Sequence, residues 1–197
     1  RQLKNLNPSG DYWGKFMRKL FIDLDDVVLD TSLSLKRIKD YIEINRDDLG
    51  ISEKDNMVDV SVMFLLDNYN RVPIKDGFLP IFDILKERYE IVFVSMYISE
   101  KEYAYKSFIA RKLGVDIKLL SVSDYSDKSS IDMDGGVLID DTPSMLTSSS
   151  ATKKVLFTSK VNKLLQSVVF NRKYSVVSSW DEVYYLLEEE INGKEVQ

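Results

Sequence analysis

Short apolar segments alternate with amphipathic segments along most of the chain. The apolar segments predict strands at about 18–23, 91–94, 117–122, 136–139, 154–157 and 174–177. The amphipathic segments predict helices at about 78–88, at about 99–113, where Gly114 is a typical helix stop, and from Ser178 or Ser179 to about Glu190. Because strands that are apolar throughout belong to sheets covered on both faces, this alternation predicts an α/β protein with a Rossmann-like parallel sheet and helices on both faces.

One long segment interrupts the alternation. From Thr31 to about Asn70 the apolar residues recur at helical spacing, with a polar stretch at 45–56 that separates two helices. We expect this segment to be a small helical cap inserted directly after the first strand. The predicted division is a core of residues 1–30 and 71–197 and a cap of residues 31–70.

Two of the predicted strands end in pairs of carboxylates. Asp23 and Asp25 follow the first strand, and because residues two apart in a strand share a side, we expect their side chains to crowd together. Asp140 and Asp141 end the strand that begins at Gly136. Neighbouring carboxylates repel each other unless a cation or a shared proton offsets their charge. The two pairs therefore indicate one divalent-metal site, although an acidic turn is the simpler reading of either pair alone.

Composition narrows the chemistry that the chain can perform. Its 197 residues are 44% hydrophobic and 30% charged, which indicates an ordered globular protein. It contains no cysteine and no histidine, which excludes thiolate or imidazole metal ligands, cysteine nucleophiles and Ser-His triads. Carboxylates, lysines and hydroxyls remain, and the metal that suits them is Mg²⁺.

The distribution of charge and hydropathy guides our expectations about partners and location. The net charge is −5 and the cationic residues are scattered, so we expect no dedicated nucleic-acid surface. The apolar runs are too short to span a bilayer and no apolar signal core is seen near the N-terminus, so we expect a cytoplasmic protein without membrane association. The sequence leaves open whether the chain forms a homodimer. Residues 1–17 predict an irregular, loosely packed lead-in, and a chain that starts at Arg1 rather than Met reads as trimmed or partial.

Two further polar residues stand where ligands bind in parallel sheets, beyond the carboxyl ends of the strands. Ser95 follows the apolar run 91–94, and Lys128 lies in the loop before the second acidic strand. Taken alone, Ser95 reads as a solvated loop hydroxyl and Lys128 as a surface lysine. Together with the carboxylates they supply a nucleophile, a metal site and donors for phosphoryl oxygens, which are the parts that phosphoryl transfer needs.

The order of these residues resembles the four motifs of the haloacid dehalogenase (HAD) superfamily of phosphatases. Asp23–Val27 is similar to the first motif, DxDx(T/V), Ser95 to the second, Lys128 to the third and Ile139–Asp141 to the fourth. The resemblance extends over nearly the whole chain. The first motif alone is weak evidence, whereas all four motifs in order are a strong signal.

Within that superfamily the chain is most similar to the 5'(3')-deoxyribonucleotidases. Asp23–Asp30 resembles their DMDGVLADF segment, Val137–Asp141 their LLIDD and Val155–Thr158 their LFT segment. Tyr105–Ile109, with the sequence Tyr-Lys-Ser-Phe-Ile, resembles a Lys-aromatic helix in the same family.

Three positions depart from the pattern of the nucleotidases. Asp26 stands where that family usually has Gly, Ser95 where it has Thr, and Met96 where it often has a second phosphate-binding hydroxyl. The 31–70 segment aligns poorly, and the corresponding segment of the family helps to choose the base.

The resemblance implies a role for each motif residue. Asp23 would be the nucleophile that forms an aspartyl-phosphate, and Asp25 the general acid and base. Mg²⁺ would be held by the Asp23 carboxylate, the Asp25 backbone carbonyl and the Asp141 carboxylate, with Asp140 orienting these ligands. The phosphate-binding positions would be Ser95, Met96, Lys128 and Lys106.

The implied function is a Mg²⁺-dependent phosphomonoester hydrolase, with a (deoxy)nucleoside monophosphate as the leading substrate. A phosphatase for a sugar phosphate or a 3'-phosphate end, and a catalytically silent phosphate-binding module, are the alternatives. Lys106 lies in a helix with other cations, so a solvated face is an equally good reading of it. We interpret Tyr41, Phe64 and Tyr69 as residues of the cap core rather than as groups that stack on a base.

Overall fold

The computed structural model describes residues 17–122, 127–158 and 174–194 and confirms the predicted fold class. Within these ranges, a six-stranded parallel sheet has the strand order β3-β2-β1-β4-β5-β6. The strands are β1 (Arg18–Ile22), β2 (Tyr89–Tyr97), β3 (Asp116–Ser121), β4 (Val137–Asp140), β5 (Lys153–Phe157) and β6 (Ser175–Val177). The most acidic strand ends belong to β1 and β4, which are neighbours at the centre of the sheet.

The helices match most of the predicted ranges. They are α1 (Thr31–Ile44), α2 (Met57–Asp67), α3 (Phe78–Leu85), α4 (Glu100–Leu113), α5 (Pro143–Ser148) and α7 (Trp180–Lys194), with 3-10 turns η1 (Tyr69–Arg71) and η3 (Lys128–Ser130). Helix α5 was not predicted, because six residues are too few to establish a period. The last helix starts at Trp180, where the Ser179 hydroxyl accepts a hydrogen bond from the Glu182 N–H, and continues to Lys194 rather than to Glu190.

Alternate residues of the central strands pack on opposite faces of the sheet. Leu20 and Ile22 of β1 belong to a core cluster with α3 and α7, whereas Phe21 belongs to a second cluster with Leu146 of α5. Both faces are therefore covered by helices, which is why the central strands carry buried apolar residues on both sides. Of the predicted lead-in, residues 1–16 lie outside the described residues.

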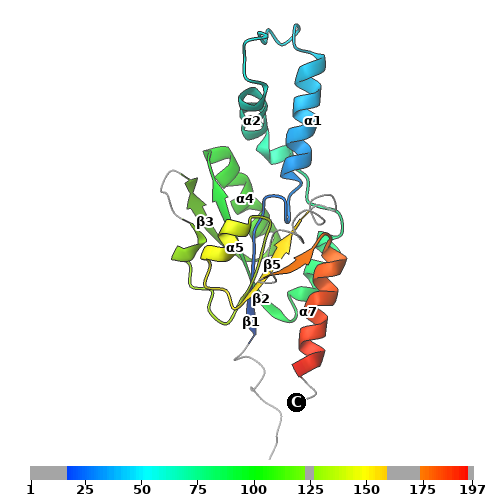
Figure 1. The fold of residues 1–197 in the computed structure, drawn as a ribbon, viewed down its shortest axis with the longest axis vertical. Helices are drawn as coiled ribbons and strands as arrows, with labels where there is room; N and C mark the ends of the chain where they lie inside the picture. The colour runs from blue at the N-terminus through cyan, green and yellow to red at the C-terminus, as the bar shows by residue number, and fades with distance from the viewer. Residues whose placement is uncertain (1–16, 123–126, 159–173, 195–197) are drawn as a thin grey trace, which may run out of the picture.

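Helices α1 and α2 form a helical hairpin that projects from the carboxyl edge of the sheet (Figure 1). The polar stretch 45–56 connects them as predicted. The hairpin returns to the core through η1, whose Tyr69 is buried, and through an ion pair of 2.7 Å between Asp67 and Lys101 of α4. The boundary between a core domain and a cap domain stays a prediction. None of the helices in the described ranges is both long and apolar enough to cross a membrane.

The loop from β1 to the helical hairpin is buried and fixed to the core. Leu24, Val27, Val28 and Leu29 have no exposed surface. Trp180 of α7 donates its indole N–H to the Val27 carbonyl at 3.0 Å, and its ring lies against Phe78 and Phe157. The first residue of the last helix therefore holds the loop that carries the first acidic pair.

Replacing Trp180 by Phe tests this anchor. The change removes the hydrogen bond to Val27 and leaves a small void, so the free energy of unfolding should fall by about 1–3 kcal/mol. Tyr185→Phe on the exposed side of the same helix is the matched control and should change it by less than about 0.5 kcal/mol. Urea unfolding of both variants measures the difference, and equal stabilities would contradict the anchoring role.

Candidate active site

The register of the sheet brings the acidic strand ends together. Ile22, the last residue of β1, pairs with Phe93 of β2 and Ile139 of β4. The Asp23 N–H then donates to the Ile139 carbonyl at 2.9 Å. Asp23 and Asp140, which are far apart in the sequence, thus lie side by side at the carboxyl edge.

Lys128 connects these two carboxylates. Its Nζ is 2.6 Å from Asp23 Oδ1 and also donates to Asp140 Oδ2. The side chain is buried, and its turn is fixed by the Asp127 carboxylate, which accepts the Ser129 N–H at 2.9 Å. Lys128 is therefore not the surface lysine that it would be in isolation.

Asp141 completes an acidic cluster with Asp23 and Asp140. One carboxylate oxygen from each of the three residues lies within 4.8 Å of the others. Asp140 Oδ1 accepts the Thr142 N–H at 2.8 Å, and Asp141 Oδ1 accepts the Thr142 hydroxyl at 3.1 Å. When ionised, the three carboxylates carry three negative charges, and the Lys128 ammonium neutralises one of them. One divalent cation would neutralise the remaining two.

Burial and repulsion disfavour ionisation of this cluster. Burial raises the pKa of Asp23 to about 7 despite the opposing charge of Lys128, and the Asp140 and Asp25 charges add to the rise. Burial and the charges of Asp23 and Asp140 likewise raise the pKa of Asp141 to about 8. Burial alone would lower the pKa of Lys128, but the charges of Asp23 and Asp140 raise it, so this lysine stays an ammonium. A cation at the cluster would favour the ionised carboxylates.

The donor set fits a hard divalent cation such as Mg²⁺. All three groups are carboxylates, the ligands that Mg²⁺ prefers. Both oxygens of Asp140 are occupied, by Lys128 and by the Thr142 N–H, whereas Asp23 and Asp141 each keep one oxygen without a partner among the described residues. This pattern supports Asp23 and Asp141 as metal ligands and Asp140 as a residue that orients them. The Asp25 backbone carbonyl stays a prediction as a further ligand.

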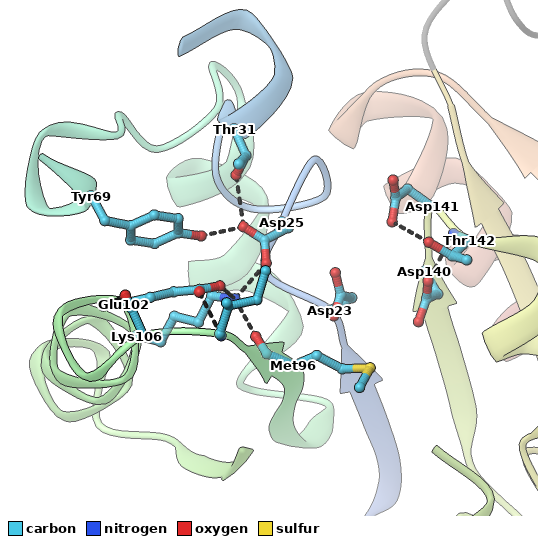
Figure 2. Close-up of polar contacts among 12 residues, drawn as sticks. Asp23, Asp25, Thr31, Tyr69, Met96, Glu102, Lys106, Asp140, Asp141 and Thr142 are labelled. Atoms are coloured by element: carbon cyan, nitrogen blue, oxygen red, sulfur yellow. Dashed lines mark hydrogen bonds and ion pairs between the residues drawn. The ribbon is translucent and has the colours of Figure 1, made fainter. Parts of the chain in front are cut away.

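Asp25 has a separate set of partners (Figure 2). Its Oδ1 accepts the Thr31 hydroxyl at 2.8 Å and the Tyr69 hydroxyl, and its Oδ2 accepts the Lys106 ammonium. The strand alternation does not extend to Asp23 and Asp25, because β1 ends at Ile22, so the crowding of their side chains stays a prediction. Their charges still interact, but each carboxylate has its own buried lysine.

Lys106 is wholly buried, so the reading as part of a solvated face is wrong. Besides Asp25, its Nζ contacts the Met96 carbonyl and Glu102 Oε1, the latter at 2.6 Å. Although burial acts to lower the pKa of Lys106, the charges of Asp25 and Glu102 raise it above its ordinary value. Its role as a phosphate ligand stays a prediction.

Ser95 and Met96 stand at the carboxyl end of β2. Ser95 is fully buried and its hydroxyl has no hydrogen-bond partner in the described part of the chain. An unpaired buried hydroxyl is unfavourable by about 1–3 kcal/mol, which a ligand oxygen would recover. The phosphate-binding roles of Ser95, Met96 and Lys128 stay predictions.

Asp26 occupies a backbone conformation that favours glycine. Its φ is +55°, in the left-handed region, and it is the non-glycine residue with positive φ among those described. Its carboxylate accepts the Ser32 N–H at 2.8 Å and also the Ser32 hydroxyl. Asp30 is the N-cap residue of α1, but its side chain makes no capping hydrogen bond. The Asp26 carboxylate, which lies in the turn before the helix, caps the first turn of α1 instead. This explains how an aspartate is accommodated where the resemblance expects glycine.

Sequence reasoning missed several partners of the site. Tyr69 was interpreted as cap core, and it is buried, but its hydroxyl also reaches Asp25. Glu102 and Lys106 form an i,i+4 pair, a signal that usually marks an exposed helix face. Thr142, directly after the acidic pair, is a further partner, and the Asx-type turn that aspartate favours is the sequence signal for it.

The chain matches known proteins in structure but not in sequence. No protein-family model and no curated protein matches it. Solved structures do match. One is a haloacid dehalogenase-like protein of unknown function from Agrobacterium tumefaciens, with a TM-score of 0.61 and 12% identity over 89% of this chain and 100% of that chain.

Two further matches widen the comparison. A protein from Thermotoga maritima assigned as a β-phosphoglucomutase matches with a TM-score of 0.55 and 13% identity, over 88% of this chain and 99% of that chain. A protein from Bacillus subtilis assigned as a HAD-hydrolase and bound to magnesium matches with a TM-score of 0.50 and 13% identity, also over 88% and 99%. At these identities the likeness shows the fold, and the chain has the fold of HAD-like hydrolases.

Binding of Mg²⁺ to the acidic cluster should stabilise the protein. At Mg²⁺ concentrations about a hundredfold above the Kd, the free energy of unfolding should rise by about 2.7 kcal/mol. Asp141→Asn should remove most of this gain because it weakens one ligand. Asp76→Asn, which removes a nearby exposed carboxylate outside the cluster, should keep it. Equal gains in the two variants, measured by denaturant unfolding with Mg²⁺ or EDTA, would exclude Asp141 as a ligand.

The turn at Asp26 can be tested by two substitutions that both remove the carboxylate. Asp26→Gly should be more stable than Asp26→Ala by about 1 kcal/mol, since glycine adopts positive φ without the steric penalty of a Cβ. Chemical denaturation of the two variants measures the difference. If the alanine variant were as stable as the glycine variant, the left-handed turn would not be a constraint.

Proposed function

We propose that the protein is a Mg²⁺-dependent phosphomonoester hydrolase that acts through an aspartyl-phosphate on Asp23. The observation that carries this proposal is the cluster of Asp23, Asp140, Asp141 and Lys128 at the carboxyl ends of the two central strands. A nucleophile, a candidate metal site and a buried ammonium meet there, and Asp25 lies two residues beyond the nucleophile.

Asp23 supplies the nucleophilic oxygen. Lys128 binds Oδ1, whose second lone pair would hold the cation, and this leaves Oδ2 to attack phosphorus. A bond forms between Oδ2 and phosphorus while the bond from phosphorus to the leaving oxygen breaks, and Asp25 gives that oxygen a proton. Water then attacks phosphorus and loses a proton to Asp25, and the bond to Asp23 breaks to release inorganic phosphate.

Charge determines what the site needs besides these groups. A phosphate dianion would meet a cluster that already carries two uncompensated negative charges. When bound, Mg²⁺ would neutralise these charges and polarise the phosphoryl group. Lys128 holds Asp23 and Asp140 in place, and the unpaired Ser95 hydroxyl is available to bind a phosphoryl oxygen.

The leading substrate is a (deoxy)nucleoside monophosphate. Support comes from the resemblance to the nucleotidases and from a cavity of about 490 Å³ next to Asp141, a volume within the usual range for small-molecule sites. The cavity wall includes Asp26, Asp30 and Asp76 against the single cation Lys75, so a leaving group with further phosphates would be repelled. A sugar phosphate or a 3'-phosphate end is the second candidate on the same grounds of size. A silent binding module would need neither the nucleophile nor the acid.

Asp23→Asn is the most direct test of the mechanism. The amide keeps the shape of the side chain but is not a usable nucleophile, so kcat for p-nitrophenyl phosphate should fall by at least about three orders of magnitude. The melting temperature without metal should stay the same or rise slightly, since one of three mutually repelling carboxylates is removed. The measurement is steady-state hydrolysis with Mg²⁺, together with thermal unfolding in EDTA.

The controls separate chemistry from folding. Asp181→Asn removes an exposed carboxylate of α7 that is not part of the cavity wall and should keep p-nitrophenyl phosphate turnover. EDTA should abolish the activity of the wild type and Mg²⁺ should restore it, with Ca²⁺ doing so poorly. Retention of more than about a tenth of wild-type turnover by Asp23→Asn would exclude the covalent mechanism. A panel of nucleoside monophosphates and sugar phosphates would then identify the substrate class.

A further inference from the structure

Both oxygens of Asp25 are held by side chains from three separate elements. Thr31 begins α1, Tyr69 follows α2, and Lys106 lies in the middle of α4, and the three converge on this carboxylate (Figure 2). Thr31 and Tyr69 are the two ends of the helical hairpin, whereas Lys106 belongs to the layer of helices that covers the sheet. The carboxylate therefore joins the hairpin to the core.

Tyr69 is built into this position. Its ring is buried, with an edge-to-face contact to Tyr105 at 6.0 Å between centroids. The Lys106 Nζ lies 5.5 Å from the ring centroid, within the range of a cation–π interaction. Burial and the Asp25 charge raise the pKa of Tyr69 far above its ordinary value, so its hydroxyl acts as a donor. These two contacts of the ring, together with its burial, fix the orientation of that hydroxyl.

The Lys106 ammonium is likewise held in one position by its hydrogen bonds. An ammonium has three N–H donors, and three acceptors surround this one: Asp25 Oδ2, the Met96 carbonyl and Glu102 Oε1. Glu102 is itself fixed, because its other oxygen accepts the Ile98 N–H at 2.8 Å. No donor of Lys106 is left for a phosphate in this arrangement.

We propose that Tyr69 is a positioning residue which, together with Lys106, holds the Asp25 carboxylate in the orientation needed for proton transfer. The inference rests on the proposed function and deepens it. Lys106 then acts through Asp25 and not on the substrate phosphate. Because Tyr69 and Thr31 end the two arms of the hairpin, the same hydrogen bonds tie the placement of the hairpin to the chemical step.

Leaving-group basicity separates a positioning role from a merely structural one. Phenyl phosphate and p-nitrophenyl phosphate have nearly the same shape, but phenolate is a much poorer leaving group and needs a proton from a general acid. General acid catalysis contributes about 10²- to 10⁴-fold when the acid is well placed. A misplaced Asp25 should therefore slow phenyl phosphate and spare p-nitrophenyl phosphate, whereas partial unfolding slows both equally.

Tyr69→Phe removes the hydroxyl and keeps the ring. We expect kcat/KM for phenyl phosphate to fall at least about tenfold and kcat/KM for p-nitrophenyl phosphate to change less than about threefold. Tyr105→Phe is the matched control: it removes a hydroxyl from the neighbouring ring, where it donates to the Val72 carbonyl and does not contact Asp25. This control should leave the ratio of the two substrates unchanged. Equal losses on both substrates, or none, in Tyr69→Phe would overturn the proposal.

Two further variants keep the test decisive. Should Tyr69→Phe fail to fold, Thr31→Val removes the other hydroxyl on Asp25 Oδ1 and should shift the substrate ratio in the same direction. Lys106→Met is made together with Glu102→Gln, so that Glu102 is not left as a buried carboxylate without its cation, while Asp25 keeps its two hydroxyl donors Thr31 and Tyr69. This double variant should also lose activity on phenyl phosphate selectively, while inhibition by inorganic phosphate changes less than about threefold. A loss of phosphate inhibition much larger than that would overturn the role assigned to Lys106.

The outcomes distinguish this inference from the proposed function. If the wild type hydrolyses neither aryl phosphate with Mg²⁺, the proposed function is wrong and the inference falls with it. If the wild type hydrolyses both, Asp23→Asn hydrolyses neither, and Tyr69→Phe behaves like Tyr105→Phe, the inference alone is wrong.

Discussion

The compensation of buried and half-buried carboxylates by two buried lysines is the interaction on which the carboxyl edge of the sheet depends. Removing an ion from water is unfavourable by several kcal/mol unless a partner and hydrogen bonds offset it. Lys128 offsets Asp23 and Asp140, and Lys106 offsets Asp25 and Glu102. Each ammonium neutralises only one of its two acids, and Asp141 adds a further negative charge, so the cluster of Asp23, Asp140 and Asp141 keeps two negative charges. This residual charge is the physical reason to expect a cation there.

The two lysines divide the edge into halves with different tasks. On one side, the Asp23 cluster is rigid because the strand register, the Lys128 contacts and the Thr142 turn all fix its members. On the other side, Asp25 is held by side chains that belong partly to the helical hairpin. In the proposed mechanism the rigid half carries the phosphoryl group, and the half connected to the hairpin moves the proton.

The loop between the halves transmits this arrangement to the rest of the fold. Trp180 fixes Val27 from the last helix, and Asp26 holds the first turn of α1 by its contacts with Ser32. The Trp180 contact joins residues 153 positions apart, whereas the Asp26 contact is local and spans six positions. Asp26 adopts an unfavourable backbone conformation, and in this conformation its carboxylate makes the hydrogen bonds that cap α1.

The sequence by itself determined the sheet, most of the helices and the set of acidic strand ends, because strand burial and helix amphipathicity leave periodic signals in neighbouring residues. It also singled out Lys128, through its place between two strands. Only the tertiary structure decided which groups meet Asp25. The sequence indicates a cap-core residue for Tyr69 and either a phosphate-binding residue or a solvated helix cation for Lys106, and their contacts with Asp25 depend on where the hairpin and α4 lie against the strand ends. Such contacts join residues 44 and 81 positions away from Asp25, a separation over which no periodicity carries information, so folding alone brings them together.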